Sequence, residues 1–150
     1  MDLIKLSDGF NSFRIHVLGR HSPGVLPLHD LLDAEILIET SFATGKLNIH
    51  LPHRYLAEWA DCLDSLEQGH DAEWLDQGNG PTLGVEISGD QKGDITVSAE
   101  DGSGSGVRVS VPLALDSDWI DEQRDLLKKV LTAWPSEVEE TAPGSYTWRR

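Results

Sequence analysis

Seven segments of this chain alternate apolar and polar residues with a period of two, and this pattern constrains the fold more than any other feature. In residues 12–19, Phe13, Ile15 and Val17 fall on one side, with polar residues such as Arg14 between them. Such a strand has one packed face and one wet face. The other six segments are residues 2–6, 33–40, 46–51, 82–88, 94–100 and 107–113. Short turns rich in Gly, Asp and Ser join several of them, which predicts antiparallel pairing.

Two further segments change to a period of about 3.6 residues, which predicts helices. The first follows Pro52 and should end at Gly69, a residue suited to the left-handed position after a helix. Its apolar stripe is Tyr55, Leu56, Trp59, Ala60, Leu63 and Leu66. The second helix should begin near Asp116 to Asp118 and end before Trp134-Pro135, with Gln123 interrupting its apolar stripe.

The order of these elements predicts an α+β fold: a single antiparallel sheet of about six or seven strands with both helices packed on one face. The opposite face of the sheet should then be polar. We expect one domain over residues 1–135 and a flexible C-terminal tail over residues 136–150. A long connection, residues 20–32, carries a Pro-Gly turn and has a length that often accompanies function.

The charge of the chain is strongly negative. It has 26 Asp and Glu against 12 Lys and Arg, a formal net charge of -14. Such a field repels nucleic acid and anionic membranes and favours a basic protein partner, although acidity can also serve solubility alone. The chain has no apolar segment of membrane-spanning length and no secretory leader, and its single cysteine, Cys62, forms no internal disulfide. These features predict a cytoplasmic protein.

Motifs for catalysis, metals and cofactors are missing from the sequence. The six histidines show no His-x-His or His-Glu-x-x-His spacing, and there is no Gly-rich turn opening a helix. Residues 102–106 superficially match Gly-x-Ser-x-Gly but join two strands rather than a strand and a helix. His16 and His50 would meet on the wet face if their strands were neighbours, an arrangement that ordinary cross-strand polar pairs also produce. We therefore expect no enzyme activity, no cofactor and no metal site.

The candidate partner-binding residues fall in two places. The wet face of the sheet should present Glu35, Glu39 and His50. An acidic loop adds a tryptophan among carboxylates, the kind of anchor that suits a basic surface. The loop residues are Asp71, Glu73, Trp74 and Asp76. The alternative is that Trp74 and Leu75 simply pack this loop onto the sheet.

The element order resembles a known family. The chain begins with a strand hairpin, followed by the strand around Asp33-Ala34-Glu35-Ile36, the helix of residues 56–69, Glu73-Trp74-Leu75, a strand meander and a last helix ending in Trp134-Pro135. This order is similar to that of the WapI-like immunity proteins of bacterial toxin systems. Uncharacterised small actinobacterial proteins share the same layout. The resemblance covers residues 2–135 and leaves out the 20–32 connection and the C-terminal tail.

The resemblance implies a cytoplasmic protein that neutralises a cognate toxin by tight binding. Many such toxins are basic nucleases, which an acidic inhibitor would complement in charge. We therefore expect a non-enzymatic, immunity-type protein-binding module. The alternatives are a small-ligand-binding or regulatory domain and, third, an enzyme without a local motif.

Overall fold

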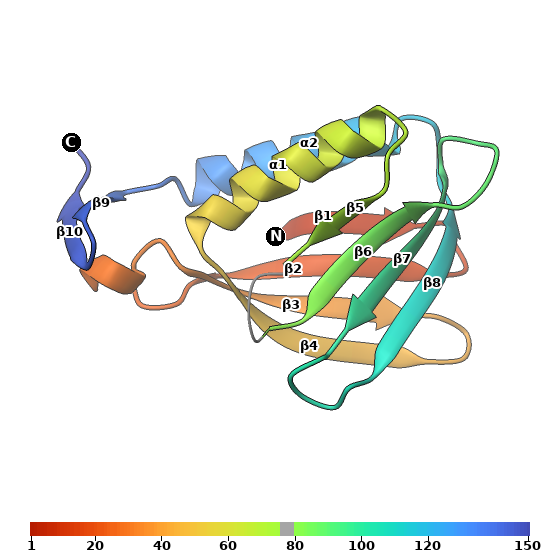
Figure 1. Ribbon diagram of the computed structural model, residues 1–150, viewed down its shortest axis with the longest axis horizontal. Coiled ribbons are helices and arrows are strands. Elements are labelled where there is room, and N and C mark those ends of the chain that lie inside the picture. The colour runs from red at the N-terminus through yellow and green to blue at the C-terminus, as the bar shows by residue number, and fades with distance from the viewer. Residues whose placement is uncertain (76–79) are drawn as a thin grey trace.

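The computed structural model describes residues 1–75 and 80–150, and within them the chain forms two α-helices and three antiparallel sheets (Figure 1). The first sheet has the order β1-β2-β3-β4 and the second β5-β6-β7-β8, while β9 and β10 form a separate hairpin. The strands are β1 (Asp2–Ser7), β2 (Ser12–Arg20), β3 (Leu32–Glu39), β4 (Thr44–Leu51), β5 (Ala72–Trp74), β6 (Thr82–Ile87), β7 (Asp94–Glu100), β8 (Arg108–Ala114), β9 (Val138–Ala142) and β10 (Ser145–Trp148). The helices are α1 (His53–Glu67) and α2 (Trp119–Ala133), with a short 3-10 turn, η1 (Leu26–Leu28).

The seven expected strands and both helices are confirmed, but the single sheet is wrong. The strands divide into separate four-stranded sheets because β5, which follows α1, pairs with β6 and not with β4. Strand alternation shows that each strand has a packed face but not whether a helix or another sheet covers it. Here the buried side chains of both sheets and both helices belong to one hydrophobic cluster. The two sheets therefore share a core, which three fully buried tryptophans, Trp59, Trp74 and Trp119, help to fill.

The helices lie along the edges of the sheets rather than on one face. Helix α2 packs along β1, α1 packs along β5, and the two helices pack against each other, as Figure 1 shows above the strands. Gln123 of α2, only 1% exposed, accepts a hydrogen bond from the N–H of Lys5 at 2.9 Å and donates one to its carbonyl at 3.0 Å. On the other side, the indole of Trp74 donates to the carbonyl of Tyr55 at 2.9 Å. These bonds give partners to the buried polar groups of Gln123 and Trp74 and to the backbone of Lys5 at the edge of the first sheet. Neither helix is long and apolar enough to cross a membrane.

A bulge near the end of β2 changes which side chains face outward. Val17 pairs with Ala34, but the next pair is Gly19 with Asp33, so Leu18 is the extra residue. Gly19 has a φ of 145°, which a residue with a Cβ rarely adopts. Because side chains alternate along a strand, the extra residue moves His21 onto the same side of the sheet as Asp33. That outward side of β1 to β4 is called the open face below.

Candidate functional site

The predicted partner-binding residues lie in two separate places. Glu35 and Glu39 of β3 and His50 of β4 share the open face of the first sheet. Glu35 is paired with Lys46 at 2.6 Å, and the Nδ1 atom of His50 lies 2.8 Å from the carboxylate of Asp33. Glu39 is exposed at the end of β3. The open face thus carries the expected polar residues, but much of its charge is already paired within the protein.

The acidic loop belongs to the second sheet, on and beside β5. Asp71 accepts a hydrogen bond from the N–H of Ile87 at 2.9 Å, and Glu73 is exposed. Trp74 is only 2% exposed and packs against Trp59, with ring centroids 5.2 Å apart. Its indole is therefore part of the core, and we do not propose it as an anchor. Asp76 lies outside the described residues. A groove of about 330 Å³ runs beside this strand, lined by Glu58, Asp61, Asp71 and Glu73 together with Cys62, Ser65, Ala72 and Trp74.

Two exposed phenylalanines lie at one end of the first sheet, and sequence reasoning did not single them out. Phe10, in the β1–β2 turn, is 87% exposed, and Phe42, in the β3–β4 turn, is 98% exposed. The two turns are neighbours because Ser12, which begins β2, pairs with Glu39, which ends β3. The sequence pattern that indicates them is an aromatic residue in each of two polar turns, outside any alternating segment.

Side-chain hydrogen bonds fix the backbone of both turns. The carboxylate of Asp8 accepts from the N–H groups of Phe10 at 2.9 Å and Asn11 at 2.8 Å. The backbone bond from Asn11 is the main cause that lowers the pKa of Asp8. In the other turn, the hydroxyl of Thr40 accepts from the N–H groups of Phe42 and Ala43. Both rings are thus presented on ordered backbone. Near them on the open face is a hollow of about 240 Å³, lined by Ser12, Arg14, Leu37, Ile38, Glu39, Thr44, Gly45 and Lys46.

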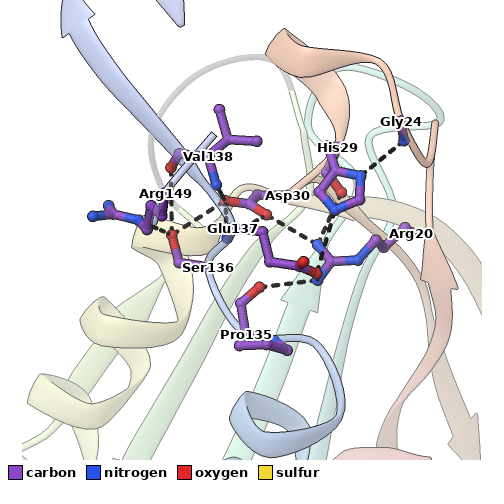
Figure 2. Close-up of polar contacts among 9 residues, drawn as sticks. All are labelled: Arg20, Gly24, His29, Asp30, Pro135, Ser136, Glu137, Val138 and Arg149. Carbon is purple, nitrogen blue, oxygen red and sulfur yellow. Dashed lines mark hydrogen bonds and ion pairs between the residues drawn. The ribbon is translucent and has the colours of Figure 1, made fainter. Parts of the chain in front are cut away.

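A second feature is the polar network that joins the C-terminal hairpin to the 20–32 connection (Figure 2). The carboxylate of Asp30 accepts from the N–H groups of Glu137 and Val138, each at 3.0 Å, and from the Ser136 hydroxyl at 3.1 Å. It also accepts from Arg20 at 3.0 Å. Burial alone would raise the pKa of Asp30, but these hydrogen bonds together hold that pKa below its usual value.

Arg20 extends the network to the hairpin. Its Nη2 donates to the carbonyl of Pro135 at 2.9 Å and to the carboxylate of Glu137 at 2.6 Å. His29 packs edge-to-face on Trp148, with centroids 4.7 Å apart. Figure 2 shows Asp30 and Arg20 of the 20–32 connection in contact with residues 135–138 of the C-terminal segment. Residues 136–150, expected to be a flexible tail, thus form an attached hairpin in the structure, and their mobility in solution stays a prediction.

A cavity of about 520 Å³ lies between this hairpin, η1 and the start of α1. It is lined by Leu26, Pro27, Leu28, Asp30, Leu31, Pro52, His53, Arg54, Ser136, Val138, Glu140, Tyr146 and Arg149. The Nε2 atom of His53 is buried and has no hydrogen-bond partner among the described residues. Burial lowers the pKa of His53, so its neutral form is favoured. A volume of this size and a mixed lining suit a small polar ligand.

A third group of side chains joins the ends of three neighbouring strands. The Nδ1 atoms of His21 and His50 lie 2.9 Å and 2.8 Å from the same oxygen of Asp33. The two imidazole rings meet edge-to-face at 5.0 Å. His16, the expected neighbour of His50, instead pairs with Asp2 at 2.9 Å, because β3 lies between their strands. Sequence reasoning missed His21 because the bulge in β2 cannot be read from alternation.

Comparison with known proteins places the chain in a family. A model of a family of unknown function, DUF5959, matches residues 1–135. The chain belongs to this family. Among the curated proteins, none matches it. The match ends at Pro135, so the hairpin formed by β9 and β10 lies beyond it.

Proposed function

We propose that this DUF5959 protein is a non-enzymatic protein-binding module that recognises a basic partner through the phenylalanine end of its first sheet. The observation that carries the proposal is the pair of exposed rings, Phe10 at 87% and Phe42 at 98%. Exposed apolar patches often mark protein–protein interaction sites, and here two large aromatic side chains are exposed on adjacent turns. Aromatic side chains dominate the binding energy of protein interfaces, since each removes a large apolar area from water.

The turns support this role because their backbones are already ordered. Asp8 and Thr40 fix the two turns by hydrogen bonds to the residues that carry or follow the rings. Ordered turns reduce the conformational entropy lost on binding. The hollow on the open face nearby offers a place for a partner side chain, and Glu39 is the exposed carboxylate at its rim.

The net charge of -14 supports a basic protein as the partner. A basic protein would be drawn to this surface by long-range attraction, whereas nucleic acid and anionic lipid would be repelled. The resemblance to WapI-like immunity proteins narrows the proposal to an immunity-type role in the cytoplasm. In that role the partner is a cognate toxin domain, and a basic nuclease fits the charge.

The test uses affinity capture from the native cell lysate at low salt, followed by measurement of Kd with the purified partner. The double variant F10S/F42S removes both rings, and Val107→Ser is the matched control, since Val107 is 56% exposed in the β7–β8 loop. An interface anchor contributes about 2 kcal/mol or more, which is about 30-fold in Kd, so the double variant should weaken binding by at least roughly 30-fold, and by roughly 1,000-fold where the two contributions add. The control should bind as the unmodified protein does, and the affinity should fall as salt rises.

Equal binding by F10S/F42S and the unmodified protein would contradict the proposal that the partner binds at the phenylalanine end of the first sheet. Charge reversal at Glu39 tests the role of the exposed carboxylate at the rim of the hollow. It should slow association and reduce the salt dependence, because a charge at the rim of an interface acts mainly on the association rate.

The cavity beside His53 supports a second candidate, a small-ligand-binding or regulatory domain. The specific observation is that His53 lines this cavity and that its Nε2 atom has no hydrogen-bond partner among the described residues. A thermal-shift screen of small metabolites, repeated with His53→Phe, tests it. A compound that raises the Tm of the unmodified protein but not of the variant would favour this candidate.

A further inference from the structure

We propose that His21, Asp33 and His50 form a binding site for a divalent transition-metal ion, with Zn²⁺ the best fit. This site is independent of the protein-binding role proposed above and lies near the opposite ends of β3 and β4 from the two phenylalanines. One potential ligand atom from each residue lies within 4.8 Å of the other two. Two imidazole nitrogens and one carboxylate oxygen make a donor set typical of zinc sites that keep an open position.

The strand register assembles this set. Asp33 of β3 lies directly opposite His50 of β4 and Gly19 of β2. His21 follows Gly19 by two residues, and its N–H donates to the carbonyl of Leu31 at 2.8 Å, which fixes its backbone beside β3. The central carboxylate therefore has an imidazole on each side. Bulges recur next to functional sites because they re-aim side chains, and without the bulge His21 would fall on the packed side.

The observed distances are close to those of a metal-bound state. Both Nδ1 atoms lie within 2.9 Å of Asp33 Oδ1. Ligand atoms around a tetrahedral Zn²⁺ are roughly 3.4 Å apart, given metal–ligand bonds of about 2.0–2.2 Å. An ion would thus need each imidazole nitrogen to lie roughly 0.5 Å farther from the carboxylate oxygen. The side chains have room to do so, because His21 is 39% and His50 60% exposed.

The chemistry of the donors selects the ion. Each imidazole would bind through Nδ1, with its remaining proton on Nε2, and the carboxylate would supply one oxygen. Solvent is open to the site and would supply a water as the fourth ligand. Magnesium favours oxygen ligands in octahedral geometry and does not fit two imidazoles. The negative charge of the chain raises the local concentration of any cation.

The two imidazoles share one carboxylate oxygen. Both rings direct Nδ1 at Asp33 Oδ1, so three potential ligand atoms already face one another. The neighbouring carboxylate on the same face of β3, Glu35, is instead paired with Lys46. The three-residue group is thus set apart from the ion pairs around it.

The experiment is a calorimetric titration of the full chain with ZnCl₂, repeated with MgCl₂, together with thermal unfolding of the protein in the presence of each ion. The unmodified protein should bind one Zn²⁺ in this site and gain Tm by mass action, while Mg²⁺ should leave Tm unchanged. The variants His21→Ala, His50→Ala and Asp33→Asn should each weaken Zn²⁺ binding by at least about tenfold. Even groups that only hydrogen-bond to the ligands of a metal contribute about 10- to 100-fold to its affinity.

Two histidine variants serve as matched controls. His70→Ala changes an exposed histidine in the turn after α1, and His16→Ala changes the histidine that contacts Asp2 and the N-terminal amine. Both should bind Zn²⁺ as the unmodified protein does. Loss of binding in His16→Ala but not in His50→Ala would place the ion at the N-terminal group and overturn the proposal. Equal binding by a His21→Ala/His50→Ala double variant, or no saturable binding by the unmodified protein, would also overturn it.

Discussion

The carboxylate of Asp30 attaches the C-terminal hairpin to the rest of the molecule, and replacing it should release the hairpin without unfolding the core. Asp30 is 15% exposed and accepts hydrogen bonds from two backbone N–H groups, one hydroxyl and one guanidinium. The hairpin itself buries little, since every residue of β10 and all but the first of β9 are exposed. Its attachment therefore depends mainly on this polar network.

The expected effect of Asp30→Ala follows from the bonds that it removes. A hydrogen bond to a charged group contributes about 1.5–3 kcal/mol net, and such contributions are not additive. Arg20 keeps its bonds to Pro135 and Glu137 in the variant, so part of the attachment survives. We therefore expect the free energy of hairpin release to fall by about 2–3 kcal/mol, well short of the sum over four bonds.

Native-state hydrogen exchange measures this release directly. The backbone amides of residues 137–149 should exchange roughly 30- to 150-fold faster in Asp30→Ala, because each 1.4 kcal/mol is a factor of ten. The amides of β3 and β7 should keep their protection. Asp90→Asn, a change at an exposed aspartate in the β6–β7 turn, is the control and should alter neither group.

Acid should have the same effect as the substitution. The folded-state pKa of Asp30 is lowered, so its contribution is present above the unfolded pKa of about 3.9 and is lost as pH falls through the folded value. The hairpin of the unmodified protein should therefore detach below about pH 4, a transition that Asp30→Ala should lack. Unchanged exchange in the hairpin of Asp30→Ala, or an equal loss of protection in β3, would refute the local attachment.

Three further outcomes are expected. Gln123→Ala should lower the free energy of unfolding by about 2–3 kcal/mol in a urea titration, because it leaves the N–H and carbonyl of Lys5 without their partner. The control Arg124→Ala, on the solvent side of the helix, should lower it by less than about 1 kcal/mol. Gly93→Ala should lower Tm strongly, since an added Cβ would come within 1.9 Å of the Leu115 carbonyl, whereas Gly102→Ala meets open space and should lower Tm far less. Trp59→Ala should cost about 3–5 kcal/mol of unfolding free energy, because the side chain is fully buried against Trp74.

Alternation and helical periodicity predicted most of the elements but not their arrangement. The seven strands and two helices follow from local pattern, and Gly69 ends α1 with a φ of 83° as expected. The short β5 and the hairpin of β9 and β10 have no such pattern and were missed. The division into two sheets depends on which strand pairs with β5, a long-range choice that a strand's own residues do not encode.

Gln123 shows why a break in a pattern can be informative. In the sequence it interrupts the apolar stripe of the second helix, which weakens the helix prediction. In the structure it is buried and bonded at both ends to the backbone of β1, an edge strand with groups free to pair. A glutamine at a core position indicates that the helix packs beside polar groups that need partners, and the unpaired edge of a strand supplies such groups.

The bulge at Leu18 links the two polar groups at this end of the first sheet. Arg20 and His21 are consecutive, so they project to opposite sides of the strand. With the bulge, Arg20 is 10% exposed and reaches Asp30, while His21 lies beside Asp33 on the open face. Without the extra residue the two residues would exchange sides of the sheet, with Arg20 directed to the open face and His21 to the core. Attachment of the C-terminal hairpin and assembly of the histidine group thus depend on the same local change of register, whose sequence signal is only the glycine that follows Leu18.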